Sequence, residues 1–220
     1  MMRYKLLGKS GLRVSELALG TMTFGTDWGW GADKETSRKI FDTFGAAGGN
    51  FIDTANNYTN GTSEQFVGEF IADRRDRYVV ATKYTLRLTT GDEGNFNLGG
   101  NSRKSMVRSV ENSLRRLNTE YIDVLYLHMW DFTTPSEEVL RAMDDLVRAG
   151  KVLYVGFSDS PAWVISHAVA LAERYGWARP VVTQLPYNFA SRDAERAVVP
   201  MAKTLDISVA AWGLLSGGAF

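Results

Sequence analysis

Seven short apolar segments alternate with longer amphipathic segments along the chain, and no other feature constrains its fold as strongly. Most of the apolar segments are continuous rather than alternating in polarity, which is typical of strands covered on both faces. They are Glu16–Thr21, Asn50–Asp53, Tyr78–Lys83, Tyr121–His128, Leu153–Ser158, Val181–Tyr187 and Ser208–Gly213. The alternation predicts an all-parallel sheet, and either a doubly wound sheet or a (β/α)8 barrel would satisfy it.

The amphipathic segments carry the start and stop signals of helices. Capping or proline residues open them and small or asparagine residues close them, which predicts helices at Asp33–Ala47, Ser102–Asn118, Pro135–Gly150 and Ser160–Gly176. Pro200 predicts a kink, or a helix in two pieces, in the last segment. Before the repeat, residues 4–7 and 12–15 flank a glycine-containing turn and predict a β-hairpin. No linker interrupts the chain, so residues 1–220 are predicted to form one domain.

Composition narrows the classes of function. The 25 lysines and arginines balance the 25 aspartates and glutamates, so we expect neither nucleic acid nor an anionic membrane as a partner. Cysteine is absent and the histidines are His128 and His167 alone, which disfavours a metal site. The chain has no apolar stretch of membrane-spanning length and no secretory signal at its start, so we predict a cytoplasmic protein. The pairs Arg74-Arg75 and Arg115-Arg116 are predicted to lie on solvated helix faces.

Polar residues stand at the carboxyl ends of the predicted strands, where a parallel barrel gathers its catalytic groups. They are Asp53, Lys83, His128, Ser158, Asp159, Gln184 and Trp212. Tyr58 lies five residues after Asp53, in a loop that can fold over the same end. Each also has a structural interpretation: Asp53 and Lys83 as an internal ion pair, Tyr58 as a packing aromatic and His128 as a core residue.

Together these groups suit the reduction of a carbonyl. A carbonyl that receives hydride develops negative charge on its oxygen and needs a proton donor. A tyrosine phenol has an ordinary pKa near 10 and is a poor acid unless its phenolate is stabilised. The Lys83 ammonium would stabilise it, and Asp53 would hold the ammonium through a charge-assisted hydrogen bond. His128 would orient the carbonyl or relay a proton.

Seven motifs resemble those of the aldo-keto reductases and follow the order of that family. They are LALGTMTFG (17–25), FIDTANNYTNGTSEQFVGEFI (51–71), VVATK (79–83), SLRRLNTEYIDVLYLHMWD (113–131), GKVLYVGFSDS (150–160), TQLPYNF (183–189) and AWGLLSGGAF (211–220). The resemblance covers nearly the whole chain and implies a (β/α)8 barrel that reduces aldehydes or ketones. No G-x-G-x-x-G follows the first strand, which further disfavours the doubly wound sheet.

The resemblance also implies roles for single residues. Asp53, Tyr58, Lys83 and His128 match the catalytic tetrad, with Tyr58 as the general acid. The positions that match the nicotinamide cofactor site are Gly20, Thr21, Met22, Asp53, Ser158, Asp159, Gln184, Trp212, Gly213, Leu214, Ser216 and Gly218. Ser158 and Gln184 would hold the carboxamide and Trp212 would stack on the ring. Asp159 stands where the family most often has asparagine, and an ionised carboxylate accepts hydrogen bonds but donates none.

The family most often uses NADPH, with NADH as the alternative, and no metal, so the resemblance implies an oxidoreductase of class EC 1.1.1 with a small carbonyl substrate. Trp28, Trp30 and Trp130 are predicted to line the substrate pocket beside Tyr58 and His128. The loop 84–101 is predicted to be a mobile cover over the site. The tryptophan at 212 resembles the bacterial and potassium-channel β-subunit-like branches.

One departure from the family concerns length. The family barrel has eight strands, whereas the seventh predicted strand ends shortly before Phe220. We therefore expect the eighth strand, the last helices and the C-terminal loop to be missing, through an omitted tail, a subunit that fills the gap or a truncated product. An NADPH-binding regulatory subunit with little turnover is the alternative function, and a barrel remnant without cofactor is a third. The oligomeric state, a homo-oligomer included, stays open.

Overall fold

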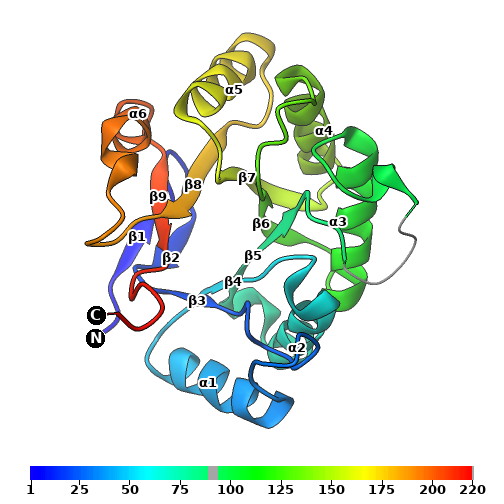
Figure 1. Ribbon diagram of the computed structural model, residues 1–220, viewed down its shortest axis with the longest axis vertical. Helices are drawn as coiled ribbons and strands as arrows, with labels where there is room; N and C mark the ends of the chain where they lie inside the picture. The colour runs from blue at the N-terminus through cyan, green and yellow to red at the C-terminus, as the bar shows by residue number, and fades with distance from the viewer. Residues whose placement is uncertain (89–93, 220) are drawn as a thin grey trace.

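The alternating segments fold into a curled parallel sheet with helices on its outer side (Figure 1). The structure is a computed structural model that describes residues 1–88 and 94–219. All seven predicted strands are present, in chain order, each hydrogen-bonded to the next. They are β3 (Ala18–Gly20), β4 (Phe51–Asp53), β5 (Val79–Tyr84), β6 (Ile122–Leu127), β7 (Val152–Ser158), β8 (Pro180–Pro186) and β9 (Ser208–Trp212). Because their order never reverses, the sheet is part of a barrel wall and not a doubly wound sheet.

The helices cover the outer side of this sheet, and their ends carry the predicted caps. They are α1 (Lys34–Ala46), α2 (Thr62–Ile71), α3 (Arg103–Leu117), α4 (Ser136–Arg148), α5 (Ala162–Tyr175) and α6 (Val198–Thr204). The Asp33 side chain accepts a hydrogen bond from the Thr36 N–H at 2.8 Å, and the Ser102 hydroxyl accepts one from the Ser105 N–H at 3.3 Å. Asn118 ends α3 with a left-handed φ of 49°. Within the described ranges, no helix is both long and apolar enough to cross a membrane.

The last amphipathic segment forms two pieces, as Pro200 predicted. A short 3-10 turn, η4 (Asp193–Arg196), precedes α6, and Ala197 between them has φ −140° and ψ −51°, outside helical values. Pro200 lies in the first turn of α6, where a missing N–H removes no hydrogen bond within the helix.

The core has two layers, because the residues of each strand alternate between the helix side and the barrel interior. In β6, Leu125 and Leu127 belong to the large cluster that packs against the helices, whereas Val124 and Tyr126 belong to a second cluster inside the barrel. All residues of β6 are buried. A continuous apolar segment is what two covered faces require.

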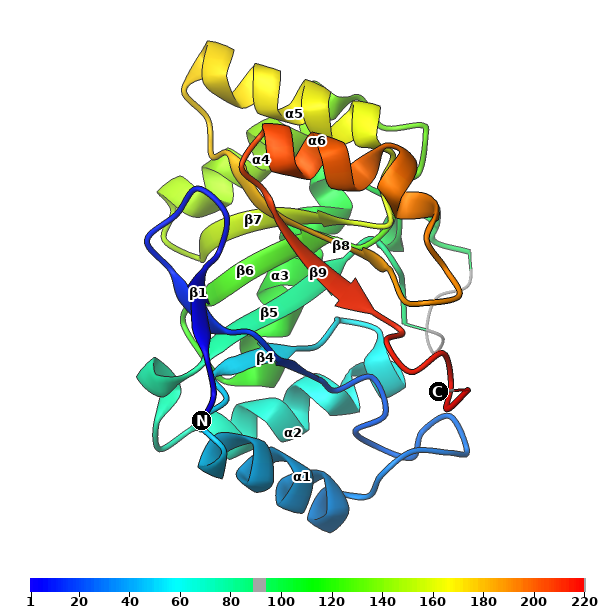
Figure 2. The same ribbon diagram turned by 90° about the vertical axis from the view of Figure 1, so that its left-hand side faces the viewer.

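The predicted hairpin covers the amino end of the barrel (Figure 2). Its strands are β1 (Tyr4–Leu6) and β2 (Arg13–Ser15), and its turn reaches the start of β9, where the Gly8 N–H donates to the Ser208 hydroxyl at 2.7 Å. Gly8 has a φ of +54°, and a Cβ there would lie 2.1 Å from the Val181 carbonyl oxygen, so only glycine fits. The hairpin leaves the opposite, carboxyl end of the strands for a functional site.

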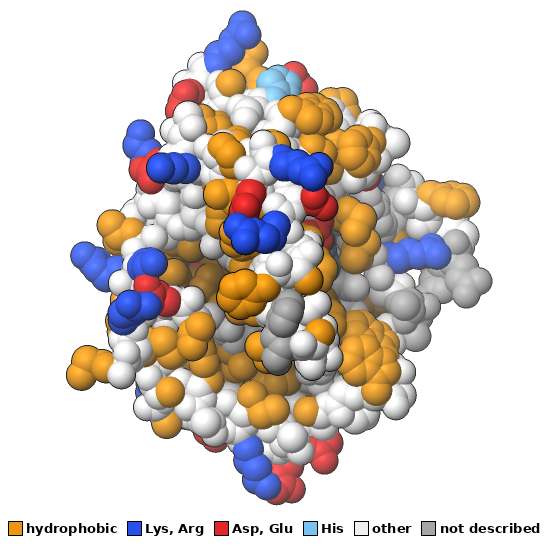
Figure 3. Space-filling view, turned by 60° about the vertical axis from the view of Figure 1, so that its left-hand side comes forward, with side chains coloured by type: hydrophobic (Ala, Val, Ile, Leu, Met, Phe, Trp, Pro, Cys, Tyr) orange, Lys and Arg blue, Asp and Glu red, His pale blue; other side chains and the backbone are white. Residues whose placement is uncertain are grey.

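An apolar groove separates the edge strands β3 and β9, since no strand of the described residues lies between them. The groove has a volume of about 590 Å³, with Leu17, Val209 and Ala211 among its lining residues. Figure 3 shows hydrophobic side chains gathered around a hollow on this side of the molecule. The described sheet is therefore a half-barrel, open on one side.

Two arginines that were predicted to be solvated are paired in the interior instead. Arg116 of α3 lies against α2, where its Nε is 2.6 Å from Glu64 Oε2. The Glu64 side chain is fully buried, and its Oε1 accepts a hydrogen bond from the Thr82 hydroxyl at 2.6 Å. Arg75 pairs with Asp123 at 2.5 Å. The prediction was wrong at these positions because the acidic partners lie 52 and 48 residues away in sequence.

We expect the substitution Arg116→Met to lower the free energy of unfolding by about 3 kcal/mol, because it leaves the buried Glu64 carboxylate without a cation. Urea denaturation at pH 7 measures this difference. The matched control is Arg115→Met, on the exposed neighbouring position, which should change stability by less than about 0.5 kcal/mol. Equal losses in the two variants would contradict the assignment.

Candidate active site

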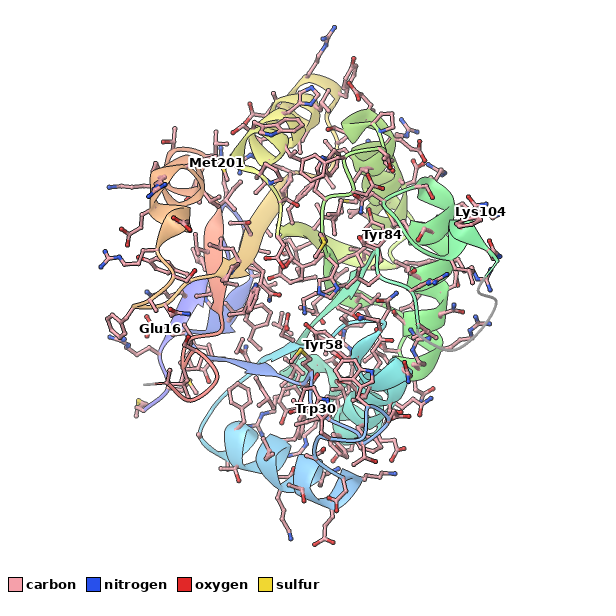
Figure 4. The ribbon with its side chains drawn as sticks, viewed as in Figure 1. Glu16, Trp30, Tyr58, Tyr84, Lys104 and Met201 are labelled. Atoms are coloured by element: carbon pink, nitrogen blue, oxygen red, sulfur yellow. The ribbon has the colours of Figure 1, made fainter. Side chains whose placement is uncertain are left out.

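Three of the predicted catalytic residues are joined by hydrogen bonds at the carboxyl ends of β4 and β5. Lys83 is the next-to-last residue of β5. Its ammonium lies 2.7 Å from Asp53 Oδ2 and donates to the Thr54 carbonyl at 2.9 Å. It also donates to the Tyr58 hydroxyl oxygen at 3.0 Å. Figure 4 shows Tyr58 near the centre of the curled sheet. Residues that are separated in the sequence therefore form one contiguous hydrogen-bonded group.

An unusual turn holds Tyr58 in this position. Tyr58 begins the 3-10 turn η1 (Tyr58–Gly61), in which Thr59, Asn60 and Gly61 all have positive φ, of 43°, 54° and 96°. Such backbone is costly for residues other than glycine and persists only where the surroundings fix it. Here the buried Thr59 hydroxyl donates to the Phe24 carbonyl at 2.5 Å and accepts from the Ser63 N–H at 3.1 Å. The turn thus ties Tyr58 to the loop after β3 and to α2.

Burial keeps the Tyr58 phenol protonated, against the effect of the Lys83 ammonium beside it. Burial alone would lower the pKa of Lys83, but Asp53 and Tyr58 outweigh that effect and raise it, so the ammonium stays charged. Burial is also the largest influence on Tyr58 and raises its pKa above 10, although Lys83 acts in the opposite direction. Lys83 therefore lowers the pKa of Tyr58, as predicted, but the loss of hydration raises that pKa by more.

His128 faces the tyrosine from the end of β6. Its ring meets the Tyr58 ring edge to face, with centroids 5.9 Å apart. Its Nδ1 is buried without a hydrogen-bond partner. Burial, together with the nearby Lys83 charge, lowers the pKa of His128 to about 3. The imidazole is neutral at physiological pH, which suits a group that orients a carbonyl oxygen and not one that releases a proton.

A second group of predicted residues lies at the ends of β7, β8 and β9. The Gln184 amide donates to Asp53 Oδ1 at 2.8 Å, which joins this group to the first. The Asp159 N–H donates to the Gln184 carbonyl at 3.0 Å, and Asp159 Oδ1 accepts a hydrogen bond from the Trp212 indole at 3.2 Å. Ser158 is buried beside them, and Trp212 is 47% exposed. Polar groups that match an amide therefore stand beside an open aromatic face, an arrangement that fits a nicotinamide.

The sequence comparison with protein families decides what kind of scaffold this is. The profile described as the aldo/keto reductase family matches residues 16–220. The chain belongs to this family.

Relatives in the aldo/keto reductase family are similar over nearly the whole chain. Norsolorinic acid reductase from Aspergillus flavus is 46% identical over 222 aligned residues, which cover 98% of the chain and 57% of that protein. Norsolorinic acid reductase B from Dothistroma septosporum is 45% identical, over 100% of the chain and 58% of its own length. Aryl-alcohol dehydrogenase (NADP(+)) from Phanerodontia chrysosporium is 46% identical, over 94% and 57%. The chain thus spans less than three fifths of these relatives, and since all three are fungal, its affinity with the bacterial and channel-subunit branches stays a prediction.

The remaining positions predicted for an aldo/keto reductase cofactor differ in their exposure. Thr21 is fully buried, and its hydroxyl donates to the Asp53 carbonyl at 3.0 Å, so it helps to hold the Asp53 backbone in place. Gly20 and Met22 are exposed beside it. The segment after β9 is also exposed and turns sharply, with positive φ at Gly213, Ser216, Gly217 and Gly218; Leu214 is 53% exposed. This segment can reach a ligand at the mouth of the half-barrel.

Tryptophans surround the mouth, though not all as predicted. Trp28 and Trp30 pack together at 5.8 Å in the loop after β3, and Figure 4 shows Trp30 on the same side of the sheet opening as Tyr58. Trp130 is buried, and its indole N–H has no partner. Trp163, at the start of α5, is 60% exposed and meets Trp130 edge to face at 6.5 Å. No sequence signal identified it, because the contact joins the loop after β6 to the first turn of α5, which are distant in the sequence.

The predicted cover, loop 84–101, is fixed at its far end. The buried Asn101 donates to the Thr85 hydroxyl at 2.9 Å and to the Met129 carbonyl at 3.0 Å. Its backbone N–H donates to Asp131 at 2.8 Å. Residues 89–93 of this prediction lie outside the described residues. In the described ranges, no three histidine, cysteine or acidic side chains gather as a metal site would require.

The lowered pKa of His128 predicts an effect of acid on stability. Below about pH 6.5 the unfolded chain protonates this histidine, but the native protein does so only near pH 3, so acid favours unfolding over that interval. Between pH 7 and pH 5, we expect the native protein to lose about 2 kcal/mol more stability than the variant His128→Gln.

Urea denaturation at the two pH values measures this difference. His167→Gln replaces the exposed histidine of α5 and serves as the control, which should lose stability as the native protein does. An equal loss in all three proteins would show that His128 titrates normally.

Proposed function

We propose that the protein reduces aldehydes or ketones to alcohols with a nicotinamide cofactor. The observation that carries the proposal is the Tyr58 hydroxyl at 3.0 Å from a buried ammonium that is itself paired with Asp53. The relatives support the proposal, since both names, norsolorinic acid reductase and aryl-alcohol dehydrogenase, denote oxidoreductases. A positioned acid of this kind contributes about 10²–10⁴-fold to a rate.

Each residue of the first group has a chemical role in this proposal. When bound, the nicotinamide supplies hydride to the carbonyl carbon. Tyr58 donates its hydroxyl proton to the carbonyl oxygen, and the Lys83 ammonium stabilises the phenolate that results. Asp53 keeps Lys83 charged and in place. The neutral His128 holds the carbonyl oxygen toward Tyr58.

The second group would hold the cofactor. Ser158, Asp159 and Gln184 would bind the carboxamide, with the side-chain Oε1 of Gln184 available because its Nε2 is bound to Asp53. Trp212 would stack on the ring. NADPH is the proposed cofactor, in keeping with the NADP(+) in one relative's name, and NADH is the alternative. The exposed segment from Gly213 to Gly218 would contact the phosphates. A cytoplasmic location and the oligomeric state stay predictions.

An aromatic carbonyl compound is the proposed substrate class. Trp28, Trp30 and Trp163 offer apolar faces around the mouth, and the buried Trp130 packs against Trp163. Aromatic faces favour flat aromatic ligands through stacking. The aryl-alcohol dehydrogenase among the relatives agrees with this proposal.

The substitution Tyr58→Phe tests the role of the acid. We expect turnover of a carbonyl substrate to fall by at least about 10²-fold, because the proton donor is lost. The dissociation constant for NADPH should change by less than about threefold, since the phenol does not recognise the cofactor. Steady-state kinetics and calorimetric titration measure the two quantities. Unchanged turnover would refute the proposed acid, and tight NADPH binding without any turnover in the native protein would favour the regulatory-subunit alternative.

Trp163→Ala tests the substrate class. We expect kcat/KM for benzaldehydes to fall about tenfold, whereas kcat/KM for short aliphatic aldehydes changes less than twofold, because only the aromatic substrates lose a stacking face. Tyr175→Ala, at the other end of α5, is the control: Tyr175 is also exposed and stacks on Trp177. Equal losses for both substrate classes would contradict the role of Trp163.

A further inference from the structure

Asp159 is fixed from three strands at once. It follows directly after β7, its N–H donates to the Gln184 carbonyl of β8 at 3.0 Å, and its Oδ1 accepts from the Trp212 indole of β9 at 3.2 Å. Its φ is +37°, in the left-handed region that non-glycine residues rarely occupy. Such a conformation persists only where the surroundings fix it. The carboxylate is therefore held at one defined place in the mouth of the half-barrel.

The charge of Asp159 is not balanced by a neighbouring side chain. No ion pair within 4 Å in the described part of the chain includes Asp159, whereas Lys83 already has Asp53 as its partner. Burial raises the pKa of Asp159, against the effects of the Trp212 hydrogen bond and of Lys83, and the Asp159 charge in turn raises the pKa of Tyr58. The carboxylate and the tyrosine therefore share one site. A partly buried, unpaired charge is unfavourable unless a ligand of opposite charge compensates it.

We infer that Asp159 balances the positive charge of the oxidised nicotinamide ring, an inference that rests on the proposed function. The ring is neutral in NADPH. It becomes positive when hydride leaves with its electron pair for the carbonyl carbon, while the Tyr58 proton goes to the carbonyl oxygen. Trp212 links the two charges, because its N–H binds the carboxylate and its exposed face is the proposed stacking surface for the ring.

Two consequences follow from this placement. The oxidised cofactor gains an attraction that the reduced cofactor lacks, so NADP+ binds more tightly relative to NADPH than it would at a neutral site. The same attraction grows as positive charge develops on the ring during hydride transfer, so Asp159 makes the bound NADPH a stronger hydride donor. A neutral amide at this position could recognise the carboxamide but would supply neither effect.

Calorimetric titrations of NADP+ and NADPH into the native protein and Asp159→Asn test the inference. The protein is used at its full natural length and at pH 8, so that the carboxyl is ionised despite its raised pKa. Asparagine keeps an acceptor for Trp212 and tolerates left-handed backbone. We expect the NADP+ affinity to fall about tenfold, or about 1.4 kcal/mol, and the NADPH affinity to change less than about twofold.

The control is Asp76→Asn, which removes an equal charge from the opposite end of the barrel. Asp76 lies in the 3-10 turn η2 (Arg75–Arg77) before β5, is exposed, and accepts a hydrogen bond from Tyr121 at 3.2 Å that asparagine can also accept. Both affinities should stay unchanged in this variant. If Asp159→Asn fails to fold, Asp159→Ser replaces it, with the same expected ratio.

Several outcomes would overturn the inference. If Asp159→Asn weakens both cofactor forms equally, Asp159 is only a contact of the carboxamide or a structural residue. If neither affinity changes, its charge does not reach the ring. If the native protein binds neither NADP+ nor NADPH, the proposed function itself fails and the inference fails with it. A native protein that binds both forms separates the first two outcomes from the third.

Discussion

The burial of the Lys83 ammonium is the constraint on which the site depends. A lysine that loses its hydration completely needs a carboxylate and further acceptors in fixed positions to offset that loss. Asp53, the Thr54 carbonyl and the Tyr58 hydroxyl supply them at 2.7 to 3.0 Å. The carboxyl ends of β4 and β5 cannot shift relative to each other without exposing a buried charge to an apolar environment. The buried Lys83 ammonium thus helps to fix the position of Tyr58, whose hydroxyl is one of its hydrogen-bond acceptors.

Polar groups at the two ends of the strands are satisfied in different ways. Polar groups at strand ends need either water or partners, and the hairpin supplies partners at the amino end through Gly8 and Ser208. At the carboxyl end the polar groups satisfy one another: Gln184 extends the Lys83–Asp53 pair from β5 across to β8. Asp159 and Trp212 continue the chain of contacts to β9. One connected network therefore crosses the described sheet nearly from edge to edge.

The sequence predicts the parts of this arrangement that depend on local pattern. Continuous apolar segments mark strands with two covered faces, caps such as Asp33 and Asn118 mark helix ends, and the strand-end positions of Asp53 and Lys83 place them together. Contacts between segments that are distant in the sequence cannot be predicted in this way, because no local pattern encodes them. The pairing of Arg116 with the buried Glu64 was missed for this reason. The raised pKa of Tyr58 is also not predictable from the sequence, because the sequence reveals the charged neighbours of this residue but not the extent of its burial.

The two halves of the site differ in how firmly the described chain holds them. Tyr58, Lys83 and His128 stand on or next to β4 to β6, each of which pairs with a strand on both sides. Trp212 ends β9, which pairs with β8 alone among the described strands and borders the apolar groove. Its orientation therefore depends on a single hydrogen bond to Asp159 more than on packing. The proposed proton-donating half is built into the core, whereas the proposed cofactor half is positioned by the unpaired carboxylate of Asp159. In the proposed site, Asp159 therefore couples the charge of the cofactor to the orientation of the Trp212 indole.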